Sequence, residues 1–484
     1  MSMLLAAGLL LSAGGSGLYR SHHENVLGTS LELKIAARSE REAARAEAAA
    51  LAEIDRLARI LSAWDPASEF SRWNATRGRA TRVSPELFET LSLFEQWRAR
   101  TGGALNAGAE SIGRVWRSAA QQKRLPGAAE LATAVKQAGE LHWRLDAAAR
   151  TATRLGSAPI ALNSLAKSYI VDRAASAAGA AGADGVVVNI GGDLAIRGAI
   201  TEDVAIADPR GGADNAAPLA RLRLRDLAVA SSGSYQRGFD IAGRHYSHIV
   251  DPRTGRTADA IIGATVVAPD AAEAGALATA FSVLTPEQTQ RVAATRPGVE
   301  YLLIAASGRR ISSAGWHHLP LVPLAQAAAA SGVEVGIQFT LARINDPRYR
   351  RPYVAVWVED KDRFPVRTLA LWTEKPRWLP DLKAWYRSDR LRALAEGVDL
   401  TASITSATRP PGKYSLKWDG KDQAGKAVKP GRYTVAIEAA REHGTYQILR
   451  QEIDLSGASQ QFTLPGNPEI ESATLDFHKA VGAR

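Results

Sequence analysis

Residues 246–255 read Tyr-Ser-His-Ile-Val-Asp-Pro-Arg-Thr-Gly, and the rest of the chain can be understood outward from them. This stretch combines a histidine, a carboxylate, hydroxyls, a proline turn and a closing glycine. Residues 236–249 predict two short strands around a turn at Gly243, so His248 falls near a strand end, just before the Asp251-Pro252 turn. Ordered turns beside sheet edges commonly carry binding and catalytic groups. The structural alternative is a hairpin with a buried, hydrogen-bonded histidine.

The composition indicates a globular protein of several domains. A chain of 484 residues predicts two or three domains, and 46% hydrophobic with 23% charged residues is typical of folded chains. The net charge of +10 comes from scattered arginines without a Lys/Arg run, which favours a solvated surface or a phosphate-bearing ligand over nucleic acid. The absence of cysteine excludes thiol chemistry, disulfides and Cys-ligated zinc.

The N-terminal residues 1–18 predict an export signal. They contain an apolar run near 4–11 followed by small residues, although no basic residue precedes the run. The run is too short to span a bilayer as a mature helix, and without cysteine it cannot be a lipoprotein anchor. No later segment predicts a transmembrane span. We therefore expect a periplasmic protein, with membrane association left open.

Residues 22–317 predict an α+β domain, because strands and helices intermix without a regular βαβ repeat. Expected helices are 39–64, 84–100, 128–139, 163–180 with Asn163 as its cap, and 270–284. Expected strands are 24–36, two within 141–161, a strand-turn-strand at 185–198, and 203–207, 219–225, 237–249, 261–268 and 299–305.

A composition change marks a second domain. Residues 318–333 are rich in Pro and Ala and predict a linker. Residues 334–484 then show short alternating strands, first at 334–342, 352–358 and 366–372, with a helix expected over 381–396. This spacing predicts a smaller β-sandwich.

Three short stretches outside the His248 segment have residue types suited to ligand binding. Gly191-Gly192-Asp193 lets a backbone turn approach a ligand and adds a carboxylate, although a simple hairpin turn explains it equally well. Ser231-Ser232-Gly233 offers hydroxyls and N–H groups to an anion, or forms an ordinary serine turn. Lys167, near a helix N-terminus, is either solvated or complementary to phosphate.

Several motifs in this order resemble those of the ApbE-like FAD:protein FMN transferases. They are Leu27-Gly28-Thr29, Trp64 with Ser68, Ser71 and Asn74, Gly103-Ala104-Leu105-Asn106, Leu165-Ala166-Lys167-Ser168-Tyr169 with Asp172, Asn189-Ile190-Gly191-Gly192-Asp193, Ser231-Ser232-Gly233-Ser234-Tyr235, the His248 stretch and Ala276-Leu277-Ala278-Thr279. The resemblance covers residues 22–315 and implies a T-fold-like α+β domain. Residues 413–420 and 429–433 of the second domain resemble DUF2271-type periplasmic domains and FlgD-like Ig modules, which by analogy implies a protein partner for that domain.

The family's reaction, as the resemblance implies it, splits FAD at its pyrophosphate. It moves FMN to a Ser or Thr hydroxyl of an acceptor flavoprotein and releases AMP. His248 is expected to be either the base that takes the hydroxyl proton or a contact to the flavin phosphate. The resemblance assigns flavin contacts to Leu27, Trp64, Asn106, Lys167, Ser232, Gly233, Tyr235, His248 and Thr254.

The resemblance also implies Mg²⁺, held by oxygens near Ser164 and by an Asp-x-x-x-Thr pair that ends here at Thr279. The chain departs from the family at this pair, because Gly275 stands at the Asp position. Ser168 replaces the glycine after the lysine, Ala161 replaces an acid, and Asn106 stands where Asp is frequent. Losing a carboxylate ligand weakens a hard-cation site, so these departures affect the metal more than the flavin.

Three functions follow in order of expectation. The first is an exported, Mg²⁺-dependent FAD:protein FMN transferase. The second is a periplasmic flavin-binding protein that has lost transfer and acts as a carrier or sensor, which Gly275 favours. The third is an adaptor that works through its C-terminal domain.

Overall fold

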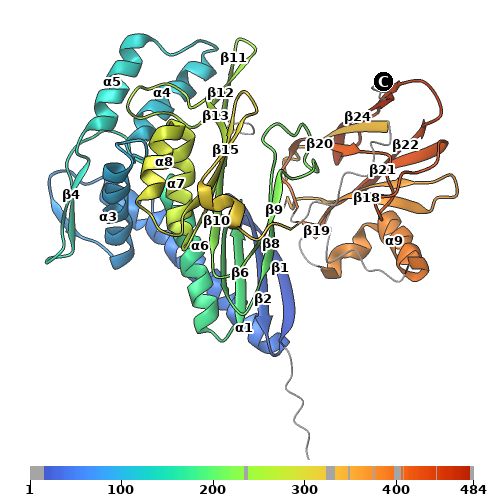
Figure 1. The fold of residues 1–484 in the computed structure, drawn as a ribbon, viewed down its shortest axis with the longest axis horizontal. Helices are drawn as coiled ribbons and strands as arrows, with labels where there is room; N and C mark the ends of the chain where they lie inside the picture. Colours follow the sequence, from blue (N-terminus) through green and yellow to red (C-terminus); the bar gives the residue numbers. More distant parts are fainter. Residues whose placement is uncertain are drawn as a thin grey trace, which may run out of the picture.

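A computed structural model of the chain describes residues 16–233, 238–322, 333–346, 349–373, 376–396, 405–406, 408–442 and 444–479. It has an N-terminal α+β part and a separate β-rich part, as the sequence predicts (Figure 1). Tyr235 and residues 1–15 and 323–332, which include most of the expected signal and linker, lie outside the described residues.

The N-terminal part is built on an eight-stranded sheet in which neighbouring strands run antiparallel. Side chains alternate across this sheet, so that one buried set packs under helices and another packs on the opposite face. The strands, in spatial order, are β1 (Gly17–Val26), β2 (Thr29–Ala37), β6 (Gly185–Ile190), β7 (Asp193–Gly198), β10 (Ala228–Gly233), β13 (Ile261–Ala268), β14 (Glu300–Ala305) and β15 (Arg310–Ser312).

Three helices cover one face of this sheet (Figure 1): α1 (Glu40–Leu61), α6 (Asn163–Ala180) and α7 (Ala271–Val283). Their apolar residues form the main core with the inward face of the strands. The opposite face packs against the hairpin of β8 (Glu202–Ile206) and β9 (Ala220–Leu224) and against the short helix η1 (Ala314–His318). Helix α8 (Pro286–Ala294) follows α7.

A helical lobe lies beside the sheet. It contains α2 (Glu69–Asn74), α3 (Pro85–Arg100), α4 (Ala109–Gln121), α5 (Ala128–Gly139) and a small sheet of β3 (Ala80–Arg82), β5 (Thr151–Arg154) and β4 (Trp143–Asp146). The hairpin of β11 (Gly238–Ile241) and β12 (Arg244–Ser247) packs onto this lobe, because Phe239 and Tyr246 lie against Trp116 of α4.

The C-terminal part is a sandwich of two sheets around one apolar core. One sheet has the order β20 (Gly412–Trp418), β16 (Val333–Leu341), β24 (Ile470–Lys479), β23 (Gln460–Leu464). The other has the order β19 (Thr405–Ser406), β18 (Pro365–Trp372), β17 (Tyr353–Glu359), β21 (Arg432–Ala440), β22 (Tyr446–Asp454). The helices η2 (Pro376–Asp381) and α9 (Lys383–Glu396) cover the outside of the second sheet.

The loop between β8 and β9 joins the two parts. Asp214 and Asn215 pair with the edge strand β20: the Asp214 N–H donates to the Ser415 carbonyl at 2.6 Å, and the Ser415 N–H donates to the Asp214 carboxylate at 3.0 Å. The Asn215 side chain exchanges two hydrogen bonds with the backbone of Lys417, at 2.8 and 2.9 Å. This loop therefore acts like a short extra strand added to the sandwich.

The structure corrects several expected elements. The single strand expected over 24–36 is a hairpin, β1–β2, turned at Leu27 and Gly28, which both have positive φ. Asn163 is the first residue of α6 rather than its cap; Leu162 precedes the helix and makes no side-chain cap hydrogen bond. Helices α4 and α8 were not expected. The hairpin around Gly243 is confirmed.

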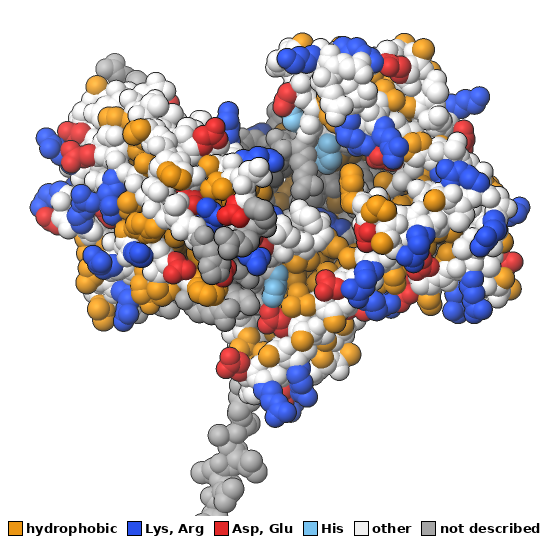
Figure 2. Space-filling model, turned by 180° about the vertical axis from the view of Figure 1, so that it is seen from behind, with side chains coloured by type: hydrophobic (Ala, Val, Ile, Leu, Met, Phe, Trp, Pro, Cys, Tyr) orange, Lys and Arg blue, Asp and Glu red, His pale blue; other side chains and the backbone are white. Residues whose placement is uncertain are grey.

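The surface carries mixed charge. On the face shown in Figure 2, Lys and Arg side chains are dispersed among acidic and apolar ones over both parts. Across the described part of the chain, no helix combines the length and apolar character needed to cross a bilayer.

Candidate functional site

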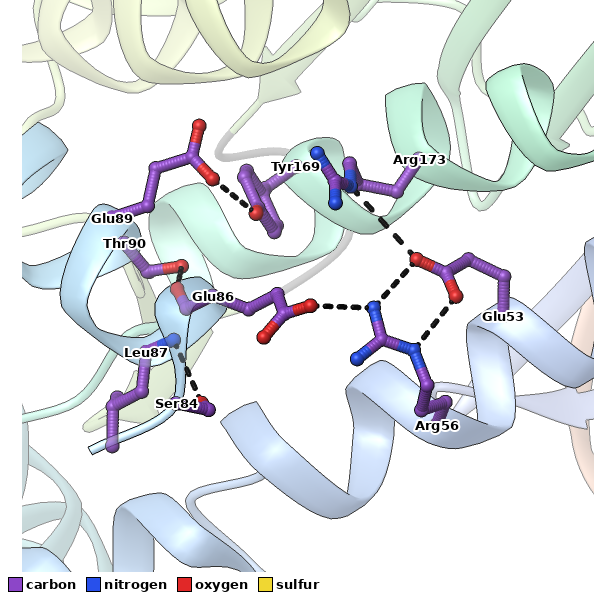
Figure 3. Close-up of polar contacts among 9 residues, drawn as sticks. All are labelled: Glu53, Arg56, Ser84, Glu86, Leu87, Glu89, Thr90, Tyr169 and Arg173. Carbon is purple, nitrogen blue, oxygen red and sulfur yellow. Dashed lines mark hydrogen bonds and ion pairs between the residues drawn. The ribbon is translucent and has the colours of Figure 1, made fainter. Parts of the chain in front are cut away.

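Helix α6 carries the central lysine of the candidate site and is anchored on its other side. Figure 3 shows Tyr169 and Arg173 pointing from α6 toward the acids of α3 and α1. The Tyr169 hydroxyl donates to Glu89 at 2.6 Å, and Arg173 lies 3.8 Å from Glu53. Arg56 joins this network by pairing with both Glu53 and Glu86. Burial, together with the carboxylate of Glu89, raises the pKa of Tyr169, so the hydroxyl stays a donor.

Asp172, another motif residue, connects α6 to α7. Its carboxylate accepts the backbone N–H groups of Ala271 and Ala272 at 2.9 and 2.8 Å, and it pairs with Arg197 at 2.9 Å. These N–H groups begin α7 and have no partner within the helix. Burial raises the pKa of Asp172, while the same hydrogen bonds oppose that shift. The motif acid therefore fixes the helix that bears Gly275 and Thr279.

Lys167 meets Asp193 at the β6–β7 turn. The ammonium lies 3.3 Å from one Asp193 oxygen and donates to the Gly191 carbonyl at 3.2 Å. The other Asp193 oxygen accepts the Ser168 hydroxyl at 2.5 Å. Gly191 has φ +55, and a Cβ there would lie 2.7 Å from the Thr29 methyl, so the close turn requires glycine.

Hydroxyl groups continue this cluster on the same face of the sheet. Ser232 of β10 alternates with Val229 and Ser231, which places it on the side of α6 and α7, and its Oγ lies 3.5 Å from Thr279 Oγ1. Ser164 lies one helical turn before Ser168 and is half-buried. The structure thus brings together Lys167, Ser232 and Thr279.

The segment with His248 leaves and re-enters the sheet at this end. The β11–β12 hairpin and the following turn connect Gly233, the last residue of β10, to Ile261, the first of β13. The turn is closed by hydrogen bonds from the N–H groups of Thr254 and Gly255 to the Asp251 carbonyl, at 3.2 and 2.8 Å. His248 is exposed rather than buried, contrary to the structural alternative.

The helical lobe holds this turn in place. Trp116 of α4 donates its indole N–H to the Gly255 carbonyl at 3.0 Å, and Arg253 pairs with Asp251 at 2.8 Å. The ion pair with Asp251 raises the pKa of Arg253. Thr254 is exposed, and its hydroxyl accepts the Arg256 N–H at 3.3 Å.

The loop with Trp64 presents an exposed ring. Ser68 caps α2 by accepting the Ser71 N–H at 3.0 Å, and both serine hydroxyls donate to the Ser62 carbonyl. Asn74 accepts the buried guanidinium of Arg154 at 2.9 Å. The motif serines and asparagine therefore shape the loop, whereas Trp64 itself is 79% exposed and free to stack on a flat ring.

Two further expected contacts are placed less favourably for a ligand. Asn106 is buried; its amide donates to the Ala138 carbonyl at 2.8 Å and its oxygen accepts the Gly108 N–H at 2.9 Å. Leu27 lies at the β1–β2 turn and packs partly on the main core.

The comparisons with known proteins come to the same class. A model of the ApbE family matches residues 27–303, and a model described as a predicted periplasmic protein, DUF2271, matches residues 334–472. A solved ApbE protein from Thermotoga maritima superposes with a TM-score of 0.57 at 25% identity, covering 63% of this chain and 99% of that chain. The flavin transferase ApbE from Vibrio cholerae superposes with a TM-score of 0.53 at 20% identity, which supports the fold.

The chain belongs to the ApbE family, joined to a DUF2271 domain. Its curated relatives include the FAD:protein FMN transferase of Treponema pallidum, 29% identical over 330 residues, which covers 63% of this chain and 90% of the relative. That of Klebsiella pneumoniae is 26% identical over 289 residues and covers 57% and 82%. The family is therefore one of enzymes.

Sequence reasoning missed one contact at the site. Ser168 was noted only as a replacement for glycine, yet its hydroxyl bonds Asp193 and its side chain fills the space facing Gly275. The signal was present in the sequence as two departures from the family, at 168 and at 275. Only the packing of α6 against α7 shows that they belong together.

Proposed function

We propose that this chain is an exported FAD:protein FMN transferase. The acceptor hydroxyl attacks the FMN phosphorus, the bond to the AMP oxygen breaks, and AMP leaves as the proton passes to a base. The carrying observation is the joint placement of Lys167, Ser232 and Thr279 at the sheet end from which the His248 segment leaves. A cation, hydroxyls and backbone N–H groups at one place suit a pyrophosphate.

The exposed Trp64 ring supports binding of the flavin or the adenine by stacking. His248 is exposed on an anchored turn, where it can take the acceptor proton or contact the phosphate. Tyr235 and Thr254 remain predicted contacts. The periplasmic location rests on the expected signal and on the description of the DUF2271 model.

The test is a transfer reaction with FAD, Mg²⁺ and a flavoprotein domain that carries an acceptor Ser or Thr, read by intact mass. We expect the acceptor to gain one FMN less one water. His248→Ala should slow transfer by about 10²- to 10⁴-fold if the histidine is the base. His245→Ala is the matched control, because His245 lies on the same hairpin and pairs with Asp240. Equal rates for the two variants would contradict the role of His248.

Magnesium dependence, which the resemblance implies, stays a prediction. Within the described residues, no three His, Asp or Glu side chains are grouped to hold a metal ion. The same fact favours the second candidate, a flavin-binding protein without transfer. Tight FAD retention with no FMN on the acceptor would support that candidate instead.

A further inference from the structure

The donor set at the α6–α7 contact does not fit the divalent cation that the family resemblance implies. The expected ligands were oxygens at Ser164 and Thr279 and a carboxylate at position 275, which is glycine. A Cβ built on Gly275 would touch Ser168 Oγ and lie 2.7 Å from Ser168 Cβ, closer than real Cβ atoms approach. Position 275 therefore cannot carry any side chain while residue 168 is serine.

Neither helix is placed to give way. On α6, Tyr169 and Arg173, the residues that flank the contact, bind Glu89 and Glu53 (Figure 3). Asp172, from the same helix, holds the first N–H groups of α7. Ser168 itself is buried and bonded to Asp193. Residues 168 and 275 thus form a coupled pair in which one side chain fills the space between two fixed helices.

The carboxylate at this place comes from Asp193 instead. A Cβ on Gly275 would lie 3.8 Å from Asp193 Oδ2, so the Asp193 group occupies the neighbourhood that a residue-275 carboxylate would enter. Its two oxygens already bind Ser168, at 2.5 Å, and Lys167, at 3.3 Å. A metal ion that used Asp193 would have to displace Lys167 and come close to its positive charge.

We propose that the Lys167 ammonium, held by Asp193 and Gly191, is the resident cation of this site, so that FAD binds without a divalent metal ion. Lys167 has 31% of its side chain exposed, which leaves the charge accessible to a pyrophosphate. The inference rests on the proposed function in one respect, namely that FAD is the ligand.

The first test is the affinity of the full chain for FAD, measured by flavin fluorescence in EDTA and in Mg²⁺. The proposal expects the two dissociation constants to agree within about twofold, whereas a coupled metal site would tighten binding by about 5- to 150-fold. Tightening of that size in Mg²⁺ would overturn the proposal.

The second test removes the resident cation. Lys167→Met should weaken FAD binding by about 10- to 100-fold, the loss expected for one charged hydrogen bond, and Lys167→Arg should retain most of the affinity. Lys136→Met, an exposed lysine of α5, is the matched control. Unchanged affinity in Lys167→Met would overturn the proposal.

The third test uses Mn²⁺ alone, followed by electron paramagnetic resonance. The wild-type chain should hold no tight Mn²⁺, whereas Ser168→Gly with Gly275→Asp should gain one site, with thermal melting to show that the variant folds. Stoichiometric Mn²⁺ in the wild type that Thr279→Val abolishes would refute the proposal. If FAD binds under no condition, the proposed function fails, yet the Mn²⁺ result still decides this inference.

Discussion

At the residue scale, the site depends on a glycine with no room for a methyl group. In an open helix, Gly→Ala raises stability by about 1 kcal/mol, because glycine is a poor helix former. At Gly275 the added carbon meets Ser168, and overpacking of a buried contact costs about 1–3 kcal/mol. The steric term is the larger one, so the sign reverses.

We therefore expect Gly275→Ala to lower the free energy of unfolding by about 1–2 kcal/mol. Gly179→Ala, at an α6 glycine with no atom within 4 Å of the added carbon, should raise it instead. Adding Ser168→Gly to Gly275→Ala should cost less than the two single losses summed, in urea unfolding of all four chains. Strict additivity would contradict the coupling of the pair.

A second residue-scale prediction concerns pH. Burial, with the nearby charge of Arg154, lowers the pKa of His142 to about 4. The unfolded chain, with a pKa near 6.5, therefore binds the proton more tightly than the folded chain does. Stability that is present above pH 6.5 is lost as the pH falls toward 4.

The part due to His142 should be about 1–3 kcal/mol between pH 7 and pH 4. His142→Gln keeps a polar group of similar size but does not titrate. Unfolding curves at the two pH values should show a smaller difference for this variant than for the wild type. The same difference in both chains would show that His142 is not responsible.

At the scale of elements, the motif helix α6 positions α7 through one carboxylate. Asp172 satisfies two of the unpaired N–H groups at the start of α7 and also pairs with Arg197. A helix that carries Gly275 and Thr279 therefore begins where α6 dictates. This explains a motif acid that contacts no expected ligand.

Asp172→Ala should cost about 2–4 kcal/mol, because it leaves two buried N–H groups and Arg197 without a partner. Ser39→Ala removes the exposed cap of α1, whose Oγ accepts the Glu42 N–H at 3.3 Å, and should cost about 1 kcal/mol or less. Thermal or urea unfolding compares the two. A loss at Asp172 no larger than that at Ser39 would contradict the anchoring role.

The elements that sequence predicted well are those with a side-chain cap. Helices α1, α3 and α7 start where Ser39, Ser84 and Asp270 accept a backbone N–H, and the sequence placed each within one residue of its start. Helix α4 begins at Gly108 without a side-chain cap, and it was missed. The β1–β2 turn was missed because an apolar residue, Leu27, adopts positive φ there.

The site was predicted in its motifs but not in its contacts. The family motifs identify Lys167, Ser232 and Thr279, and the structure brings these together. The contact of Ser168 with Gly275 joins residues on two helices that are distant in sequence. Pattern alone carries no information about which faces of two helices meet.

At the scale of the whole molecule, the β8–β9 loop connects the C-terminal sandwich with the flavin domain. Asp214 and Asn215 bind the edge strand β20, and Asp214 also pairs with Arg409 at 2.8 Å. The same loop packs Pro209 against Gly263, which pairs with Gly233. A docked C-terminal domain therefore supports the strand end that borders the site.

We expect Asp214→Ala with Asn215→Ala to release the C-terminal domain. Small-angle scattering should show a larger radius of gyration, and proteolysis between the two parts should be faster. Asp203→Ala, which breaks the exposed pair with Arg223 on β8 and β9, should change neither. An unchanged radius in the double variant would show that other contacts, such as Arg351 with Asn25, are sufficient for docking.

The most direct test of the account is a crystal structure of the full chain grown with FAD in EDTA. The account predicts the pyrophosphate beside Lys167 and Ser232, the ring system near Trp64, and no metal ion between α6 and α7. FAD bound elsewhere, or a pyrophosphate distant from Lys167, would contradict it.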